Sequence, residues 1–540
     1  MQSHINGTIR MAIFKLMKKS YKYQSISKFI LTFFILVISL LSKSSSIAFS
    51  TGSSYRNSVD YIFLNSNIIT INNSNPLAEA IAINNGYIVG VGSTNSILEQ
   101  FETNGDTTFD MEGRTIMPGI IDGHTHLMVS MLLEGSMSMS EAQEIQLSYG
   151  FTTLNEKLAY NYTDHILPFQ LAELNGTLRT RLNLFPIHNL SYLDENNESI
   201  IVENYWDSYN PILDHDKLVR VPGIKIFVDG VWGMRGLPAM SMPYPQDLYD
   251  AWGGKDPYGD LYFNQTVLNA TVKTIQDHGY ICAFHSMGDR AIETVLNAIE
   301  YAVDGETNDI YRHQLEHNSF MRDDLITKAV SLHSIHSICG YYPTFLQEVY
   351  KDAYPDEWEG WNINRYSLPS LGVHSYLETD FRWVEYNPED LTSLSNIKPF
   401  MHMWSLVTKK AIDENGTIHL PDPWLAEFLL TREQALKLMT IEGAYAVKQE
   451  DYLGTLDVGK FADLIILTND PLTCQVDDIK DIEVMLTMID GNIEYKIQNS
   501  NFPKIYSQTH SIGPINHYKK ILISSVLILT IILLTRKKKK

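Results

Sequence analysis

The feature that most constrains the fold of this chain is a change of pattern at Gly119. From there onward, short apolar segments alternate with amphipathic stretches that read as helices, such as 290–302 and 323–330. The predicted strands are the one that enters His124 and then 151–155, 180–187, 223–230, 279–285, 311–318, 332–342 and 372–380. Strands that alternate with helices in this number are typical of a closed (β/α)8 barrel. The sequence therefore predicts an α/β protein with a TIM barrel over residues 119–446.

Short β-segments precede and follow the predicted barrel. Residues 58–118 contain Asn-Asn, Asn-Gly and Glu-Gly turns between alternating strands, as a sheet of hairpins does. After a helix predicted at 432–446, similar segments return within 447–497. Because these two segments flank the barrel, we expect them to pair into one small β-sandwich domain.

Both ends of the chain carry an apolar segment next to basic residues. Residues 29–41 follow a basic stretch and precede a serine-rich one, so 1–50 is predicted to be a secretory signal or an uncleaved signal anchor. Residues 521–535 are almost uninterrupted apolar and are flanked by lysines and arginine. We expect 519–540 to form a transmembrane helix with a basic cytosolic tail, preceded by a polar stalk at 498–518.

The distribution of charge predicts a topology. Lysine and arginine cluster outside both apolar segments, which favours a cytoplasmic place for the two ends and a luminal or extracellular place for the middle. Glycosylation sequons support a luminal glycoprotein and begin at Asn72, Asn161, Asn175, Asn189, Asn197, Asn264, Asn269 and Asn415. The terminal KKKK resembles a dilysine retrieval signal. The predicted localisation is a single-pass membrane protein with a luminal catalytic domain, held in the endoplasmic reticulum.

The composition fits a large globular protein and argues against one class of partner. Hydrophobic residues make up 44% and charged residues 19% of the 540 residues, as in a folded chain with a sizeable core. The formal net charge of −21 argues against nucleic-acid binding, which needs a basic surface. Only three cysteines occur, Cys282, Cys339 and Cys474, so no disulfide framework is expected.

Polar residues of one chemical type lie at the carboxyl ends of predicted strands, where a barrel collects its active site. In chain order they are His124, His126, Lys225, His285, His317 and Asp380. His124 and His126 lie two residues apart on one strand, so both imidazoles point the same way and can reach one metal ion. Asp380 can ligate a metal and exchange a proton with bound water. The combination predicts a metal-dependent catalytic site.

Lys225 allows two interpretations at this point. Burying an unpaired lysine in a barrel mouth is unfavourable, so one interpretation is that Lys225 forms an ion pair in the core. Alternatively, it can react with CO2 to give a carbamate, an anionic ligand that two cations share. His285 and His317, each taken alone, are also compatible with structural histidines.

Five segments together resemble the amidohydrolase superfamily, and within it the amidohydrolase family 3 group that includes N-substituted formamide deformylase and YtcJ-like metal-dependent hydrolases. The segments are TIMPGIIDGHTHL, GIKIFVDGVWGMRGLPA, AFHSMGDRAIETVLNAIE, RHQLEHNSFMRDDL and LGTLDVGKFADLIILTNDPL. The resemblance spans residues 58–497 and implies a hydrolase that acts on a carbon–nitrogen bond other than a peptide bond, in a small amide or N-formyl substrate.

The resemblance also implies a binuclear metal site. One divalent ion would be held by His124, His126 and Asp380, the second by His285 and His317, and a carbamate on Lys225 would bridge the two ions. Zinc is expected, with iron or manganese as alternatives. A hydroxide between the ions would attack the carbonyl carbon, and Asp380 would carry the proton from that water to the leaving nitrogen.

This chain departs from the family pattern in two places. Strand eight reads Glu378-Thr379-Asp380, where the family has Gly-Ser-Asp, so Glu378 is an additional carboxylate whose role is a ligand, a proton shuttle or a sign of altered chemistry. The stretch between His126 and Phe151 lacks the long insertion that many members carry.

Aromatic and basic residues near the predicted mouth are candidates for substrate binding. The expected pocket walls are Trp232, Tyr341, Tyr342, Phe345 and Trp383. Arg235 or Arg382 is a candidate for binding a substrate carboxylate, because arginine forms bidentate pairs with carboxylates.

Two alternatives to the amide hydrolase remain open at this level. One is a deaminase of the same superfamily, which usually holds one metal and lacks the carboxylated lysine. The other is a catalytically degenerate, membrane-anchored barrel with a binding role. The substrate, the number and identity of the metals, cleavage of the signal and the oligomeric state are not determined by the sequence.

Overall fold

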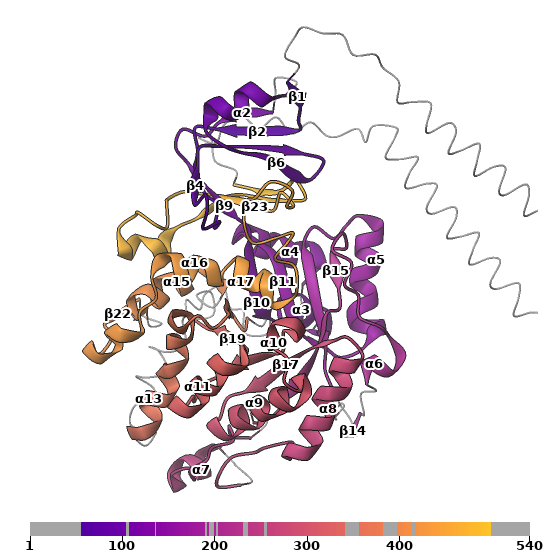
Figure 1. Cartoon of the computed structure of the whole chain (residues 1–540), viewed down its shortest axis with the longest axis vertical. Helices are drawn as coiled ribbons and strands as arrows, with labels where there is room; N and C mark the ends of the chain where they lie inside the picture. Colours follow the sequence, from indigo (N-terminus) through magenta and orange to yellow (C-terminus); the bar gives the residue numbers. More distant parts are fainter. Residues whose placement is uncertain are drawn as a thin grey trace, which may run out of the picture. The chain divides into compact units, whose positions relative to one another are not determined.

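The structure is a computed structural model. It describes residues 56–103, 107–134, 137–188, 192–193, 199–200, 204–230, 236–252, 256–340, 356–381, 397–412 and 416–497. All of these lie within the unit Arg56–Lys540, which is described here by itself (Figure 1).

Parallel strands in sequence order form two arcs of a barrel. The first arc is β10 (Ile120–Thr125), β11 (Phe151–Ala159), β12 (Arg181–Pro186) and the short β15 (Val219–Arg220). The second arc is β16 (Gly223–Phe227), β17 (Ile281–Ser286), β18 (Gln314–His317), β19 (Ile335–Ile338) and β20 (Ser375–Leu377). Each of the predicted barrel strands therefore overlaps a strand of the structure.

Backbone hydrogen bonds close the barrel at both seams between the arcs. Where β12 meets β16, the backbone N–H of His188 donates to the carbonyl oxygen of Lys225 at 2.8 Å. Where β20 meets β10, the backbone N–H of Asp380 donates to the carbonyl oxygen of His124 at 3.0 Å. Strands β15 and β16 are separated by two residues, both lie beside β12, and together occupy one position of the barrel. Eight strand positions therefore close the ring, and the predicted (β/α)8 barrel is confirmed.

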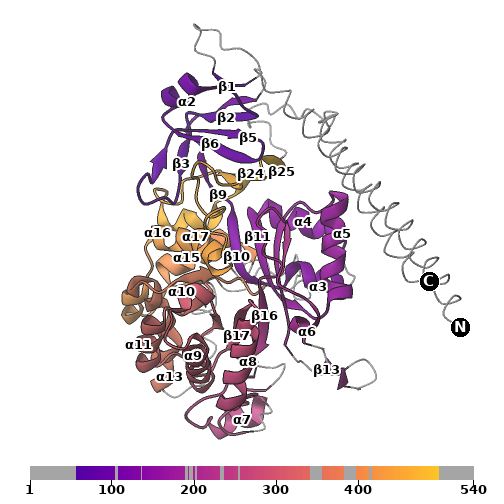
Figure 2. The same cartoon turned by 45° about the vertical axis from the view of Figure 1, so that its right-hand side comes forward.

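Amphipathic helices surround the barrel (Figures 1 and 2). The largest are α4 (Met139–Ser148), α5 (Leu167–Asn175), α8 (Gln265–Asp277), α9 (Asp289–Val303), α11 (Asp323–Leu332), α13 (Asp356–Asn364) and α15 (Pro399–Thr408). In α9, Ile292, Val295 and Ile299 are among the buried residues, at the spacing of one helix face. Shorter helices of the chain are α2 (Thr94–Gln100), α3 (Leu127–Glu134), η1 (Tyr162–Ile166), α6 (Tyr205–Ser208), α7 (Gln246–Trp252), α10 (Asn308–Tyr311), η2 (Arg365–Leu371), η4 (Pro423–Phe428) and η5 (Val476–Asp481).

The helix predicted at 432–446 is two helices, α16 (Arg432–Leu438) and α17 (Ile441–Ala446). The break lies at Thr440, whose φ of −136° and ψ of −96° are not helical. Next to the break, the carbonyl oxygen of Met439 accepts a hydrogen bond from the backbone N–H of Ile121 at 2.8 Å. The hydrogen bond to strand β10 therefore uses a carbonyl that, in a continuous helix, would accept an intrahelical hydrogen bond.

Two antiparallel-rich sheets pack face to face outside the barrel. One is β6 (Tyr87–Gly92), β5 (Ala80–Asn84), β2 (Tyr61–Leu64) and β8 (Thr108–Asp110), and the other is β25 (Asn492–Lys496), β24 (Val484–Ile489), β23 (Leu464–Leu467), β9 (Thr115–Pro118), β3 (Asn67–Ile69) and β4 (Leu77–Ala78). Strand β9 precedes the barrel and pairs antiparallel with β23, which follows it. Phe63, Ile116 and Ile466 belong to the core between the sheets. Segments on both sides of the barrel thus build one sandwich, while the exact domain limits stay predictions.

Three strand pairs are peripheral to these sheets. They are β1 (Asn57–Ser58) with β7 (Phe101–Glu102), β13 (Tyr192–Leu193) with β14 (Ser199–Ile200), and β21 (Ala411–Ile412) with β22 (Ile418–His419).

A buried ion pair joins the barrel to the sandwich. Arg181 begins β12, and its Nε and Nη2 atoms lie 2.8 and 3.1 Å from the two carboxylate oxygens of Asp463. Arg181 Nη2 also contacts the carboxylate of Asp490. The two-point geometry with Asp463 is the strong form of an arginine–carboxylate pair.

The predicted localisation is corrected by the helices of the structure. A helix needs about 20 predominantly apolar residues to cross a bilayer. Across the described ranges, no helix combines that length with sufficient apolar character. The prediction of a single-pass membrane protein with a luminal catalytic domain in the endoplasmic reticulum is therefore wrong. The segments on which it depended, 1–50, 498–518 and 519–540, lie outside the described residues, as does the predicted contact with the membrane.

Candidate metal centre

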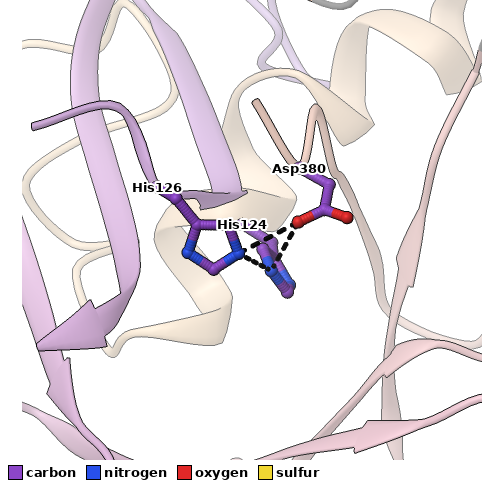
Figure 3. A group of neighbouring side chains, drawn as sticks. All are labelled: His124, His126 and Asp380. Carbon is purple, nitrogen blue, oxygen red and sulfur yellow. Dashed lines mark hydrogen bonds and ion pairs between the residues drawn. The ribbon is translucent and has the colours of Figure 1, made fainter. Parts of the chain in front are cut away.

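His124 and His126 bring two imidazoles together at the carboxyl end of β10 (Figure 3). Their Nε2 atoms are 3.2 Å apart, and their ring planes meet at 85°. Both side chains are almost completely buried, at 1% and 3% exposure. Two nitrogens that face each other at this distance can both contact one cation placed between them.

Asp380 completes this group from the segment that follows β20, on the other side of the seam. Its Oδ1 atom lies 3.3 Å from His124 Nε2 and 3.0 Å from His126 Nε2 (Figure 3). The ligand atoms of the three residues lie within 4.8 Å of one another. Burial works to raise the pKa of Asp380, but hydrogen bonding to His124 and then His126 outweighs it and holds that pKa well below its usual range. The carboxyl group is therefore ionised.

His285 in β17 and His317 at the end of β18 extend the cluster. The ring centroids of His285 and His317 are 4.6 Å apart, and those of His317 and His124 are 4.9 Å apart. Burial, followed by the neighbouring His317, lowers the pKa of His285 well below its usual value. A neutral imidazole is the form that binds metals, so His285 is in the right state for a ligand.

Glu378 belongs to a second group of potential ligands, with His124 and His317, whose ligand atoms also lie within 4.8 Å. Its carboxylate Oε1 is 2.6 Å from Nδ1 of His317. The additional carboxylate noted in the sequence therefore lies inside the cluster, in the segment that follows β20 and also carries Asp380.

Lys225 lies inside strand β16, two residues before its end, and not at the end as predicted. Its Nζ atom contacts Oε2 of Glu316, and both side chains are buried, at 1% and 0% exposure. Glu316 Oε1 lies 3.4 Å from Nζ of Lys157, and Oε2 lies 3.3 Å from Nδ1 of His124. One buried carboxylate is therefore shared by two lysines and a histidine.

The sequence interpretation did not include Glu316 and Lys157. Glu316 directly precedes His317, and the carboxylate was overlooked because only the histidine fitted the pattern of ligands. Lys157 lies in β11, which continues to Ala159, beyond the predicted end of that strand at residue 155. Lys157 directly follows the predicted apolar strand, and residues at strand ends form the active site of such a barrel. This position was the signal in the sequence that could have identified Lys157.

The residues present fit divalent cations. Imidazoles and carboxylates are the donors that zinc and related metals take in proteins. Burial works to lower the pKa of His124, but Glu316 and then Asp380 raise it to about 9. The cluster is thus arranged to hold positive charge between its carboxylates.

A carbamate on Lys225 also fits the charges around it, on one condition. A carbamate would add a negative charge next to Glu316, and two adjacent buried anions are unfavourable unless a cation balances them. Lys157 provides that cation, because its Nζ reaches the other oxygen of Glu316 and is held at 3.1 Å from Oε1 of Gln314.

Buried carboxylates also fix the backbone that carries the ligands. Asp122 accepts from the backbone N–H of His124 at 3.2 Å and from Oγ1 of Thr379 at 2.5 Å, which ties β10 to the end of β20. Asp229, which follows β16, accepts from the backbone N–H groups of Gly288 at 2.8 Å and Ala239 at 3.0 Å. The side chain of Asp229 therefore fixes the loops that follow β16 and β17.

The predicted substrate-binding residues are outside the part of the chain that the structure describes. They are Trp232, Arg235, Tyr341, Tyr342, Phe345, Arg382 and Trp383. Their roles stay predictions from the sequence.

Comparison with known families gives one match over most of the chain. A family model described as the Amidohydrolase family matches residues 134–495. The match contains Lys225, His285, His317 and Asp380, and it begins after the two histidines of β10.

Individual proteins are similar at lower levels. N-substituted formamide deformylase of Arthrobacter pascens is 25% identical over 337 residues, which are 61% of this chain and 53% of that protein. The protein YtcJ of Bacillus subtilis (strain 168) is 24% identical over 285 residues, 52% of this chain and 48% of that protein. The chain thus spans about half the length of these curated relatives.

Among solved structures, an uncharacterized metal-dependent hydrolase from Pyrococcus horikoshii OT3 superposes with a TM-score of 0.59 at 17% identity. The match covers 77% of this chain and 99% of that one. At this identity the likeness concerns the fold alone.

Proposed function

Because the chain belongs to the Amidohydrolase family, we propose that it is a metal-dependent hydrolase that cleaves carbon–nitrogen bonds other than peptide bonds. The observation that carries the proposal is the meeting of His124, His126 and Asp380 at one buried point of the barrel. A barrel strand end with two imidazoles and an ionised carboxylate suits metal-assisted hydrolysis.

In this proposal the ligands divide between two divalent ions, for which zinc is expected and iron or manganese are alternatives. His124, His126 and Asp380 would hold one ion, His285 and His317 would hold the other, and a carbamate on Lys225 would be a further anionic ligand. Such ions would activate a water near neutral pH and polarise the carbonyl oxygen of the substrate.

Asp380 has the position and charge of the proton carrier. Its Oδ1 faces the two imidazoles, whereas its other carboxylate oxygen is turned away from them (Figure 3). That second oxygen takes a proton from the attacking water and later delivers it to the leaving nitrogen. The ionised state of Asp380 at neutral pH is the state that can accept this proton.

The substrate class is a small amide or an N-formyl compound. Support comes from the similarity to N-substituted formamide deformylase, which covers 61% of this chain. The buried position of the cluster fits a small substrate that enters through the barrel mouth, where the protein can exclude water from the reacting bond.

A substrate panel tests the proposal. The purified full chain, supplied with zinc and bicarbonate, is incubated with N-substituted formamides, simple and cyclic amides, and adenine. We expect formate or another carboxylic acid plus a free amine from the amides, and no product with Asp380→Asn. Ammonia from adenine alone would indicate a deaminase instead. A folded, metal-loaded protein that turns over nothing in the panel would favour a degenerate barrel with a binding role.

A further inference from the structure

We propose that Glu378 is a positioning residue that fixes the tautomer and orientation of His317, so that the imidazole presents Nε2 to a metal ion. The inference rests on the proposed function, because it concerns one of the ligands assigned there. It gives a role to the residue at which this chain departs from the Gly-Ser-Asp pattern of strand eight.

The carboxylate of Glu378 makes hydrogen bonds through both oxygens. Oε1 lies 2.6 Å from Nδ1 of His317, and Oε2 lies 3.2 Å from the backbone nitrogen of the same residue. Oε2 also accepts from the hydroxyl of Ser337. Three donors therefore surround one carboxylate, and two of them belong to His317.

Ser337 links the two residues across the strand that separates them. Glu378 follows β20, His317 ends β18, and Ser337 lies on β19 between them. The Ser337 hydroxyl accepts from the backbone N–H of His317 at 2.8 Å and donates to Glu378. The Ser337 hydroxyl on β19 thus fixes the position of the Glu378 side chain, which crosses β19 to reach His317.

The backbone at His317 is held in place as well. Its φ of +69° lies in the left-handed region, which non-glycine residues rarely adopt. The carbonyl oxygen of His317 accepts from Nη1 of Arg365 at 3.0 Å, and its N–H is bound as described above. An uncommon conformation persists where surrounding contacts specify it, and such residues cluster at functional sites.

The hydrogen bond to a carboxylate determines which imidazole nitrogen carries the proton. A carboxylate can only accept, so Nδ1 of His317 must be the donor. The lone pair of the neutral ring is then on Nε2, the nitrogen left for a cation. The pair is buried, with side-chain exposures of 12% for His317 and 3% for Glu378, so water competes little for this bond.

The test compares Glu378→Gln with the wild type in the full-length protein. Zinc affinity is measured by competition with a chelator, and the tautomer of His317 by 15N NMR of the histidine rings. We expect the ion at His285 and His317 to bind about 10–100-fold more weakly in the variant, while the other ion is retained. In metal-free protein, the Nδ1–H tautomer of His317 should be dominant in the wild type and should lose that dominance in the variant.

A matched control exists in the same chain. His374 Nδ1 lies 2.7 Å from Oε2 of Glu442, a pair of the same chemistry that is more exposed and belongs to no group of potential ligands in the described chain. Glu442→Gln should leave both zinc affinities and the tautomer of His317 unchanged. A loss of zinc affinity in this control equal to that in Glu378→Gln would overturn the inference.

The remaining outcomes separate the inference from the function on which it rests. Complete loss of one ion without a change of tautomer would show Glu378 to be a direct ligand and would overturn the inference. Unchanged affinity in Glu378→Gln would overturn it too, with the proposed function intact. A wild-type protein that binds no metal would overturn both.

Discussion

Among individual residues, Glu316 is a buried carboxylate that contacts three basic side chains, those of His124, Lys157 and Lys225. Burial works to raise its pKa, but His124, Lys225 and Lys157 lower it well below the usual range, so the carboxylate stays charged. Lys157 in turn is so buried that its pKa falls to about 7 in spite of Glu316. In the proposed function, Glu316 balances Lys225 while that residue is a cation, and Lys157 balances Glu316 once Lys225 has become an anion.

Replacing Lys157 with methionine tests this balance. The variant keeps most of the apolar side chain but leaves Oε1 of Glu316 without its cation, which should lower the free energy of unfolding by about 1–3 kcal/mol. Metal content should no longer rise when bicarbonate is added during expression. Urea denaturation and elemental analysis measure both effects, and Lys273→Met at an exposed position is the control. Wild-type stability together with a wild-type bicarbonate response would contradict the role given to Lys157.

Replacing His285 with asparagine tests the division of ligands. We expect the variant to lose one of two metal ions and nearly all turnover, because the second ion loses one of its two imidazoles. The far-UV circular dichroism spectrum should stay unchanged, since loss of a ligand does not empty the core of the barrel. Turnover at the wild-type level would refute the assignment of two ions.

The sequence predicted some residues of the site better than others, for physical reasons. The candidate residues His124, His126, His285, His317 and Asp380 could be proposed from the sequence because each is chemically distinctive and lies near a strand end. Glu316 and Lys157 were missed because their importance depends on which side chains meet across the barrel. That arrangement follows from the registers of separate strands, which no local pattern encodes.

At the scale of elements, the seam between β20 and β10 determines where His124 and Asp380 meet. A Cβ at Gly123 would lie 2.0 Å from a ring carbon of Tyr376, so the absence of a side chain permits these strands to pack closely. The backbone hydrogen bond from Asp380 to His124 lies at this same seam.

Gly123→Ala should therefore destabilise the barrel and displace the ligands beside it. Overpacking a close contact costs about 1–3 kcal/mol, and the short distance here favours the upper end. Gly360 in α13 is the control, because its Cβ would meet nothing within 4 Å. Its replacement by alanine should stabilise the helix by up to about 1 kcal/mol. Urea denaturation of both variants measures the difference, and equal effects would contradict the packing argument.

Element types were predictable where a periodic pattern was long, and boundaries were not. The sequence placed α9 at 290–302, and the structure has Asp289–Val303, because its apolar stripe spans the whole helix. The helix predicted at 432–446 is interrupted because the carbonyl oxygen of Met439 accepts a hydrogen bond from strand β10. This contact involves a part of the chain that is distant in sequence, so the local pattern does not reveal it.

At the scale of the whole molecule, the barrel and the sandwich are joined by residues far apart in sequence. Arg181 and Asp463 pair inside this junction, with side-chain exposures of 2% and 4%. The sandwich itself needs strands from both sides of the barrel, so the protein is organised around pairing between its early and late segments. That pairing was predictable only because the two segments share strand-like patterns.

Asp463→Asn tests how much the junction contributes to stability. Removing one partner of a buried ion pair costs about 3–5 kcal/mol, and the lower end is expected because Arg181 also contacts Asp490. Asp277→Asn, which breaks the exposed pair with Lys273, should cost less than about 1 kcal/mol. Chemical denaturation compares the two variants. Metal content should stay at the wild-type level in both, since neither residue lies in the cluster.

The measurement that tests the central claim most directly is the metal content of the purified full-length protein, expressed with bicarbonate and analysed by elemental mass spectrometry. We expect about two divalent ions per chain, as in two-metal hydrolytic sites. Removal of these ions by a chelator should abolish amide hydrolysis, and their return should restore it. A folded protein that contains no metal and binds none on addition of zinc, iron or manganese would contradict the account.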